Sequence, residues 1–406
     1  MRGLVEAYRA LCDVYRGSWI DEAIRKQGSV LAENKGAFRL VYGVVEHEYL
    51  YEYRVFRLVT RAPKTAAKLL LKMGMYLLDC SSLPAYTVVN EITETAKKVG
   101  KGAVAGFVNA VLRAYSEKGK DLYPDDPRES LSVRANLPLW LVDRYIAEWG
   151  EEEATRRLTM PRTVKTHIRP AFSVGKEALA DLLRERGVDF EETAHGFYIG
   201  AVGSVADLLR DGRATVMSFG SAEVASALPF SGGEILDLCA APGGKSVYLA
   251  EKYGASVVAC DLYPHRVELI RKYAERMKVD TVSPRVEDGT VFREEWSAKF
   301  GTVIVDAPCS GLGSLAANPD VALHRTAYDL DDLSRVQYRL IENAARYVKR
   351  LGHLEYSTCS DLPSEDGDVV RWFLEKESSF LLETERYTDP AEGGGESYYY
   401  AILRKV

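Results

Sequence analysis

The chain has 406 residues, 47% of them apolar and 28% charged, which is the balance of an ordinary globular protein with room for two or three domains. No apolar run approaches the roughly 18 residues of a membrane span, and the first residues lack the apolar core of a signal peptide, so neither a membrane helix nor secretion is expected. Six cysteines are too few for a disulfide scaffold and indicate a reducing cytoplasm. The net charge of −6 does not favour a nucleic-acid partner, although a local basic face can coexist with an acidic remainder.

Residues 1–122 are predicted to be all-helical, because apolar residues recur there three and four positions apart. The pattern is clearest in three stretches, residues 37–45, 69–78 and 104–113. Basic residues gather in this part. For each of them a solvated surface position is favoured over a nucleic-acid contact. They are Arg2, Arg9, Arg16, Lys64, Lys68, Lys72, Lys97, Lys98 and Lys101. Residues 123–127, Tyr-Pro-Asp-Asp-Pro, indicate a linker.

Residues 128–215 give mixed signals and are predicted to form a small α+β domain. Helices are expected at residues 139–149 and 176–186, and short strands at residues 164–168 and 196–199. In residues 216–406 strands and helices alternate, as is typical of an α/β Rossmann-like domain with a parallel sheet. The expected strands, rich in β-branched residues, are 234–238, 255–261, 302–306, 351–356 and 398–403, the last a candidate for an antiparallel strand.

A glycine-containing loop, DLCAAPGGK at residues 237–245, follows the first strand of the α/β part. In a doubly wound sheet, ligands bind beyond the carboxyl ends of the strands, and Asp261 ends the second strand, where a carboxylate binds ribose hydroxyls. The loop is not G-x-G-x-x-G, so S-adenosyl-L-methionine suits it better than a dinucleotide. Asp288 can accept a hydrogen bond from the adenine amine. An equally good interpretation is that Asp288 is an ordinary turn residue.

Two cysteines follow later strands, Cys309 in DAPCSG and Cys359 in YSTCS. This pair suits methylation of carbon 5 of a pyrimidine. A thiolate that adds to carbon 6 makes carbon 5 nucleophilic toward a sulfonium methyl, and a second group must then help to remove the proton and expel the thiol. Asp306, three residues before Cys309, can bond ring nitrogen 3 and the exocyclic amine. The remaining cysteines, Cys12, Cys80, Cys239 and Cys260, are interpreted as structural, the three outside the loop as small buried apolar residues.

These motifs resemble those of the RNA cytosine-5 methyltransferases of the RsmB/Nop2/Sun group. The likeness covers nearly the whole chain, since residues 1–122 are similar to a NusB-like RNA-binding domain and residues 128–215 to the small α+β domain of that group. The resemblance implies that Cys359 is the nucleophile, that Cys309 assists product release, that Asp306 lies beside the methyl acceptor and that Lys245 reaches the active site. It also implies that S-adenosyl-L-methionine contacts Cys239, Ala240, Ala241, Pro242, Gly243, Gly244, Lys245, Asp261, Arg266, Asp288 and Asp306. The implied partner is RNA, rRNA before tRNA, and the protein is expected to act as a monomer without a metal ion or a membrane.

The chain departs from the family pattern in four places. Met217-Ser218 stands for the Gln-Asp of the family, His167-Ile168-Arg169 stands for Arg-Val-Asn, and Glu365-Asp366 matches a Glu-Asn pair only in its first member. The arginine-rich stretch after the first cysteine is reduced to residues 316–325. Because these departures fall mostly where RNA is held, two alternatives stay open: a methyltransferase acting on an exocyclic amine, which would not need Cys309, and an RNA-binding ribosome-assembly factor with weak or no catalysis.

Overall fold

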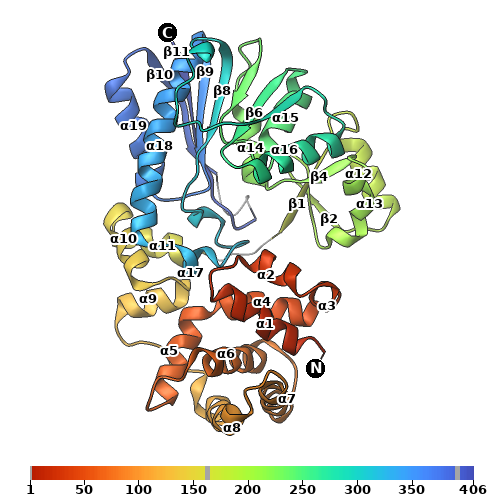
Figure 1. The fold of residues 1–406 in the computed structure, drawn as a ribbon, viewed down its shortest axis with the longest axis vertical. Helices are drawn as coiled ribbons and strands as arrows, with labels where there is room; N and C mark the ends of the chain where they lie inside the picture. The colour runs from red at the N-terminus through yellow and green to blue at the C-terminus, as the bar shows by residue number, and fades with distance from the viewer. Residues whose placement is uncertain (1, 161–164, 389–393) are drawn as a thin grey trace. The chain divides into compact units, whose positions relative to one another are not determined.

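The computed structural model describes residues 2–160, 165–388 and 394–406, drawn in Figure 1. The chain divides into two units, residues 1–160 with 318–325, and residues 161–317 with 326–406. The first is helical, and the second contains two sheets with their helices, so the predicted sequence of all-α, α+β and α/β parts is confirmed. The boundaries of the three predicted domains stay a prediction. No helix in the described ranges is both long enough and apolar enough to cross a bilayer.

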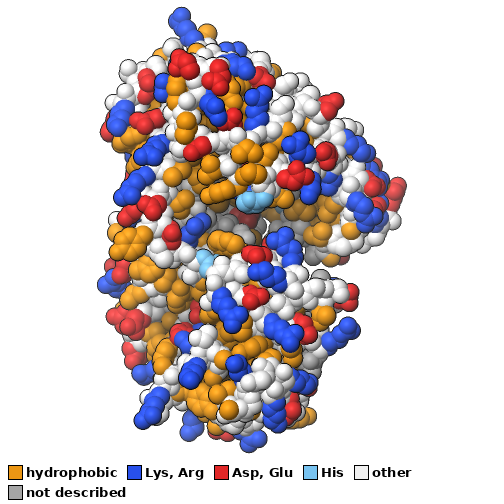
Figure 2. Space-filling model, in the orientation of Figure 1, with side chains coloured by type: hydrophobic (Ala, Val, Ile, Leu, Met, Phe, Trp, Pro, Cys, Tyr) orange, Lys and Arg blue, Asp and Glu red, His pale blue; other side chains and the backbone are white. Residues whose placement is uncertain are grey.

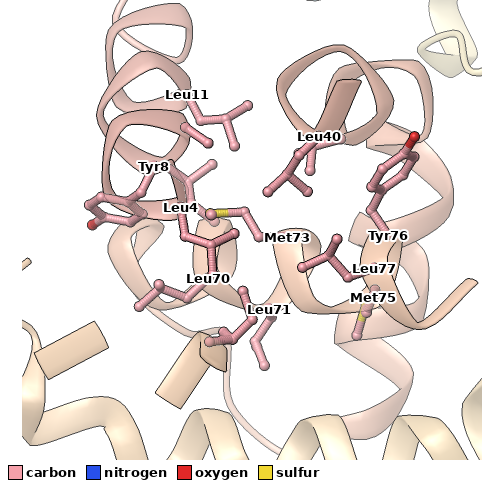
Figure 3. Close-up of a cluster of buried hydrophobic side chains, with 14 of the residues drawn as sticks. Leu4, Tyr8, Leu11, Leu40, Leu70, Leu71, Met73, Met75, Tyr76 and Leu77 are labelled. Carbon is pink, nitrogen blue, oxygen red and sulfur yellow. The ribbon is translucent and has the colours of Figure 1, made fainter. Parts of the chain in front are cut away.

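The first unit consists of helices from two parts of the chain. They are α1 (Leu4–Val14), α2 (Ile20–Lys26), α3 (Ser29–Glu33), α4 (Lys35–Glu46), α5 (Glu48–Leu58), α6 (Thr65–Cys80), α7 (Ala85–Lys98), η1 (Gly102–Val104), α8 (Ala105–Ala114), η2 (Tyr115–Gly119), α9 (Pro127–Ala135), α10 (Leu139–Trp149), α11 (Glu151–Thr159) and α17 (Val321–His324). The core surrounds α6, where every residue from Leu69 to Leu78 is buried, and Figure 3 shows side chains of α1 and α4 packing on this helix. Helix α6 can approach its neighbours closely because glycine stands at two contacts. A Cβ at Gly43 would lie 2.0 Å from the Tyr76 ring, and one at Gly74 would lie 2.5 Å from Leu112.

Lys72 of α6 is buried and does not contribute to a basic surface. Its Nζ lies 2.5 Å from Glu48 Oε1 and 2.6 Å from Glu52 Oε2, and only 1% of the side chain is exposed. The two carboxylates compensate the buried ammonium group, as a buried charge requires. Its inclusion among the candidate surface groups was therefore wrong. On the face drawn in Figure 2, Lys and Arg side chains alternate with Asp and Glu without a large area of one sign.

A short segment from late in the chain, residues 318–325, completes the first unit. The Ile20 amide at the start of α2 donates a hydrogen bond to Asp320 Oδ2 (2.7 Å), and the Tyr49 hydroxyl donates to the carbonyl of Ala322 (3.2 Å). Leu323 packs against the apolar core of this unit. Figure 1 shows α17, coloured blue, among the red and orange helices. This stretch corresponds to the reduced arginine-rich motif, and its Asp320 is used to hold the helical unit together.

The second unit begins with a four-stranded antiparallel sheet in the order β2-β3-β1-β4. Its elements are β1 (Thr166–Pro170), α12 (Lys176–Glu185), β2 (Phe190–Glu192), β3 (Phe197–Ile199), η3 (Val202–Val205), α13 (Ala206–Arg210) and β4 (Ala214–Val216). The helix predicted at residues 176–186 and the strands predicted near residues 164 and 196 are present, although residue 164 itself lies outside the described residues. The apolar faces of α12 and α13 cover this sheet.

A seven-stranded sheet in the order β10-β11-β9-β8-β5-β6-β7 forms the rest of the unit. Its elements are α14 (Phe219–Ala227), β5 (Ile235–Asp237), α15 (Gly244–Tyr253), β6 (Val257–Asp261), α16 (Pro264–Met277), β7 (Val282–Val286), η4 (Glu294–Trp296), β8 (Phe300–Asp306), η5 (Leu312–Ser314), α18 (Ala327–Tyr347), β9 (Val348–Thr358), η6 (Pro363–Glu365), α19 (Gly367–Lys376), β10 (Phe380–Tyr387) and β11 (Tyr399–Lys405). Strands β5 to β9 run parallel, and β11 is antiparallel to both neighbours, as predicted.

Helices cover both faces of this larger sheet. Helices α18 and α19 pack on one face, and α14, α15 and α16 pack on the other (Figure 1). From β5 the chain adds β6 and β7 on one side, then returns to place β8 and β9 on the other side of β5. The strand order therefore reverses between β5 and β8. Such a switch point places a ligand at the carboxyl ends of the central strands.

Candidate active site

The glycine-containing loop lies at the carboxyl end of the central strand β5. Asp237, the last residue of this strand, is buried, and its carboxylate accepts hydrogen bonds from the Ser246 hydroxyl (2.6 Å) and the Cys239 amide (3.3 Å). Burial raises the pKa of Asp237 to about 7. At Gly243 the backbone φ is 110°, the region that favours glycine, and a Cβ there would lie 3.2 Å from Ile270 Cα. Glycine therefore lets the loop turn into α15 without a clash.

Asp261 and Arg266 border the same loop. Asp261, at the end of β6, is 3% exposed, accepts a hydrogen bond from the Tyr263 amide (3.2 Å) and lies 3.4 Å from Arg266 Nε. Arg266 also donates to the carbonyl of Ala241 (3.3 Å), which joins the loop to the end of β6. A Cβ at Gly244 would meet no atom of the described residues within 4 Å, so the first turn of α15 borders open space.

The third strand end supplies the other expected cofactor residue. Asp288 follows β7, and its Oδ1 accepts hydrogen bonds from the amide and the hydroxyl of Thr290 (2.9 and 2.6 Å), so it also shapes a turn. Leu262 and Val286, each about half exposed, add apolar surface at the ends of β6 and β7. Two carboxylates, apolar side chains and an open helix start at adjacent strand ends fit the nucleoside of S-adenosyl-L-methionine.

Cys309 and Cys359 lie side by side, with 3.3 Å between their Sγ atoms. Because β8 and β9 are parallel neighbours, the loops that follow them start at the same edge of the sheet, which brings the two residues together. Cys309 is buried and Cys359 is half-buried. The hydrogen bond to Cys359 and burial raise the pKa of Cys309 well above its ordinary value, so Cys309 is a thiol at neutral pH.

Glu365, in the turn η6, holds both cysteine loops. Its fully buried carboxylate accepts hydrogen bonds from the amide (2.8 Å) and the hydroxyl of Ser310 and from the hydroxyl of Ser360 (2.7 Å). Gln337 of α18 donates to the same carboxylate (3.2 Å) and to the carbonyl of Pro308 (2.9 Å). Since each serine directly follows a cysteine, this carboxylate sets the separation of the thiols. Glu365, Ser310, Gln337 and Ser360 are called the Glu365 cluster below.

The next residue, Asp366, explains one departure from the family pattern. It accepts a hydrogen bond from the hydroxyl of Thr358, the residue before Cys359. Burial raises the pKa of Asp366 well above its ordinary value, which favours its uncharged form. A protonated carboxyl group is nearly the same size and shape as an asparagine amide, so this form is the one that most resembles the asparagine of the Glu-Asn pair.

The loop after Cys309 is joined to two other segments through Gly313. The Gly313 amide donates to the carbonyl of Cys359 (2.9 Å), and the Ser397 amide donates to the carbonyl of Gly313 (2.8 Å). A Cβ at Gly313 would lie 2.2 Å from the Ser397 oxygen and 2.9 Å from the Cys359 oxygen. Only glycine fits this position without moving one of the segments.

Asp306 and Lys245 form an ion pair, with 2.6 Å between Oδ2 and Nζ. Lys245 is 6% exposed, whereas Asp306 is 32% exposed and can meet a ligand. Burial by itself would lower the pKa of Lys245, but the Asp306 carboxylate raises it above its ordinary value, so the lysine is charged. The Tyr398 ring lies 5.7 Å from the ammonium group. Lys245 therefore lies in the site, next to the residue expected to face the methyl acceptor.

The two other departures from the family pattern have structural roles in the second unit. Ser218 donates a hydrogen bond to the Tyr398 hydroxyl (2.9 Å). Arg169 is 1% exposed and pairs with Glu251 at 2.7 Å, so it is not available to RNA. His167 is buried as well, and burial lowers its pKa to about 4, so it is neutral.

The cysteines interpreted as structural differ in burial. Cys260 is buried and Cys12 is half-buried, but Cys80 is exposed, so that interpretation was wrong for Cys80, which ends α6. Burial raises the pKa of Cys260 to about 12 and also raises that of Cys239, so both are thiols at neutral pH. No group of three or more His, Cys, Asp or Glu side chains in the described ranges is arranged to hold a metal ion.

The larger sheet is doubly wound and carries a candidate nucleoside site at the carboxyl ends of its strands. This is the architecture of a Rossmann-like methyltransferase domain, here accompanied by a helical unit. Residues 227–400 match the model of the family described as 16S rRNA methyltransferase RsmB/F, and residues 5–117 match that of the NusB family. The chain belongs to the RsmB/F family of rRNA methyltransferases. It is therefore an RNA methyltransferase whose cofactor is S-adenosyl-L-methionine.

Individual relatives support this assignment. The chain is 30% identical over 369 residues to the ribosomal RNA small subunit methyltransferase B of Xanthomonas campestris pv. campestris, covering 84% of this chain and 80% of the relative. It is 28% identical over 372 residues to the protein of the same name from Pseudomonas putida, covering 85% and 84%. In fold it is similar to the crystal structure of PH0851, with a TM-score of 0.82 and 23% identity over 100% of this chain and 98% of that one. A methyltransferase homolog protein from Pyrococcus horikoshii shares the fold over 69% of this chain and all of its own, with a TM-score of 0.60 and 24% identity.

Proposed function

We propose that the protein methylates carbon 5 of cytosine in RNA, through a covalent bond between Cys359 and carbon 6 of the base. The observation that supports this most directly is the 3.3 Å pair of thiols, Cys309 and Cys359, at a strand edge shared with the Lys245–Asp306 ion pair. The names of the relatives support rRNA of the small ribosomal subunit as the substrate, with tRNA as the alternative, and a ribosomal substrate agrees with the cytoplasmic location expected from the sequence.

Each residue has a role in this proposal. Asp306 bonds ring nitrogen 3 and the exocyclic amine and orients the base, while Lys245 fixes the Asp306 carboxylate. The Cys359 thiolate attacks carbon 6. Cys309, kept as a thiol, donates its proton toward Cys359 Sγ and stabilises the thiolate when it leaves. S-adenosyl-L-methionine, held by the loop at residues 237–245 with Asp261, Arg266 and Asp288, supplies the methyl group.

The division of labour between the thiols can be tested with labelled cofactor and small-subunit rRNA transcripts. Cys359→Ala should abolish turnover and leave no covalent RNA adduct. Cys309→Ala should still attack and transfer the methyl group but release product slowly, so a protein–RNA adduct should accumulate and survive denaturing electrophoresis. Cys80→Ala, on an exposed thiol at the end of α6 in the helical unit, is the matched control and should behave as the unchanged protein.

Three results would contradict the proposal. An adduct in Cys359→Ala rather than in Cys309→Ala would reverse the roles. Full activity in both variants would exclude thiol catalysis and favour methylation of an exocyclic amine. RNA binding without any methyl transfer by the unchanged protein would favour the assembly-factor alternative.

Cofactor binding can be tested without RNA. Calorimetry should show binding of S-adenosyl-L-methionine, and Asp261→Ala should weaken it by about 1.5–3 kcal/mol, the range of a hydrogen bond to a charged group. Tight binding of a nicotinamide dinucleotide instead would contradict the assignment of the loop.

A further inference from the structure

A hydrogen-bonded chain of side chains leads from the candidate site into the core. Glu355 and Ser357 are two positions apart on β9, so they project from the same face of the strand. Ser357 pairs in register with Asp306 on the parallel neighbour β8. The Ser357 hydroxyl lies 3.2 Å from Asp306 Oδ1 and 3.3 Å from Glu355 Oε1, and Asp306 in turn pairs with Lys245. Glu355, Ser357 and Asp306 are called the β9 relay below.

The β9 relay has few protons available for its hydrogen bonds. A hydroxyl has one proton to donate, so Ser357 cannot donate to both carboxyl groups at once. Both contacts can be hydrogen bonds at the same time only when one of the two acids is protonated and donates to Ser357. Asp306 is 32% exposed and has the Lys245 ammonium group at 2.6 Å, whereas Glu355 is 0% exposed. The proton therefore belongs on Glu355, and the relay is oriented from Glu355 through Ser357 to Asp306.

The surroundings of Glu355 agree with a neutral acid. Its Oε2 is buried and has no hydrogen-bond partner among the described residues, which is far less costly for a neutral carboxyl group than for a carboxylate. The ionisable groups that face it are Lys245 from α15, Asp306 from β8, Asp237 from β5 and Tyr400 from β11. Burial, with the two aspartates adding to it and Lys245 opposing, raises the pKa of Glu355 to about 8.

We propose that Glu355 is a positioning residue that stores a proton for the reaction and delivers it through Ser357 to Asp306, which passes it to ring nitrogen 3 of the target base. This inference rests on the proposed cytosine-5 methylation. Sequence reasoning did not single out either Glu355 or Ser357.

The proton balance closes over one turnover. When the Cys359 thiolate bonds to carbon 6, the carbon 5–carbon 6 electron pair moves to form the carbon 4–carbon 5 double bond, and the carbon 4–nitrogen 3 pair moves onto nitrogen 3. Glu355 gives its proton to Ser357, Ser357 passes its own proton to the Asp306 carboxylate, and Asp306 delivers it to nitrogen 3, which leaves Glu355 ionised. After methyl transfer, the carbon 5 proton is released to solvent as the one net proton that the reaction produces. Expulsion of the thiolate then leaves a base protonated at nitrogen 3. That proton returns along the same three residues to Glu355.

Single-turnover methyl transfer measured from pH 6 to pH 9 tests the proposal. The unchanged protein should slow as pH rises through about 8, because Glu355 then loses the stored proton. Glu355→Gln keeps the shape but cannot release a proton, so the rate should fall by roughly 10- to 100-fold, part of the range of general acid catalysis, and the decline above pH 8 should disappear. Ser357→Ala should give the same loss, the double variant should be no slower than either single one, and Ser357→Thr should restore the rate. The affinity for S-adenosyl-L-methionine should be unchanged throughout.

A second readout is independent of RNA and activity. Infrared difference spectra between pH 6 and pH 9 are compared for the unchanged protein and Glu355→Gln, so that bands of other acids such as Asp237 cancel. The two proteins should differ by the carbonyl band of one protonated acid, which is lost with a midpoint near pH 8 and is absent from the variant. A missing band, or variants with the unchanged rate and pH profile, would overturn the inference. A protein that shows the band but forms no 5-methylcytosine would instead contradict the proposed function while leaving the stored proton in place.

Discussion

Replacing Glu365 should separate the two cysteine loops. Glu365→Ala removes the acceptor for the donors of the Glu365 cluster, three on the two serines and one on Gln337, all of them in buried residues. The serine hydroxyls can turn to other partners, but the Ser310 amide cannot, and an unsatisfied buried donor costs about 1–3 kcal/mol in addition to the cavity that the side chain leaves. The local cost should therefore be about 3–5 kcal/mol for the unsatisfied amide and the cavity together.

Glu365→Gln is the matched control. Its amide oxygen can still accept from the Ser310 amide and Gln337, and its amide nitrogen can donate to the hydroxyls of Ser310 and Ser360, which can act as acceptors. The cost should be about 1 kcal/mol or less, which separates hydrogen-bond geometry from the loss of the side chain.

Hydrogen exchange and thiol cross-linking measure this locally, without assuming a single unfolding step for a chain of two units. In Glu365→Ala, exchange of the peptide around Ser310 should accelerate by about 100-fold or more, since 1.4 kcal/mol corresponds to a factor of ten. Oxidation by diamide should link Cys309 to Cys359 readily in the unchanged protein, because the sulfurs are adjacent, and at least about tenfold more slowly in the alanine variant. Unchanged exchange and linking in Glu365→Ala would refute the role of this carboxylate, and an equal loss in Glu365→Gln would show that its charge, rather than its geometry, holds the loops.

Three further substitutions test other features. Gly313→Ala should destabilise the active-site loops by about 1–3 kcal/mol, because the added Cβ meets backbone oxygens, whereas Gly203→Ala has nothing within 4 Å among the described residues and should leave exchange rates of these loops unchanged. Asp366→Asn should stabilise the protein at pH 8, with a gain that shrinks toward pH 4. Because the pKa of Asp366 is raised in the folded state, the unchanged protein loses stability as pH rises, by about 1.4 kcal/mol per unit of pKa difference. Urea titrations at several pH values measure this, and a gain that grows toward pH 4 would contradict it. Lys72→Met leaves the buried Glu48 carboxylate without its cation, while Glu52 keeps its pair with Lys68, and it should cost about 3–5 kcal/mol of stability by denaturation. The exposed Lys98→Ala should stay within about 0.5 kcal/mol, and equal effects of the two substitutions would contradict the buried position of Lys72.

The strands that could be predicted from the sequence are the interior ones. Strands β1, β3, β5, β6, β8, β9 and β11 were expected, and β2, β4, β7 and β10 were not. The four that were missed are the edges of the two sheets in the described chain. An edge strand packs on fewer neighbours and tolerates polar residues, as β10 shows with most of its residues exposed. Strand β7 even contains Pro284, which argues against a strand from sequence alone but is compatible with an edge, where one side of the backbone needs no donor.

The candidate site divides in a similar way. The cofactor loop, both cysteines and Asp306 could be predicted because each belongs to a short contiguous motif at the end of a strand. The contacts that set their geometry could not, because Gln337, Glu365 and Glu355 come from separate elements and meet only in the fold. The one local signal was a serine directly after each cysteine, a hydroxyl next to each thiol that had no assigned use. Asp366 is the converse case, a departure from the motif at a buried position where the raised pKa favours the uncharged carboxyl group.

The contact between Asp320 and the start of α2 can form only late in the synthesis of the protein. The helical unit contains residues that the ribosome adds roughly 160 positions after its main part is finished, a delay of roughly 8–30 s at ~5–20 residues per second. During that interval the surface around Ile20 and the apolar contact for Leu323 stay uncovered on the nascent chain. An isolated helical unit should accordingly be prepared from residues 1–160 together with a separate peptide of residues 318–325. A chain that ends at residue 160 lacks part of this unit.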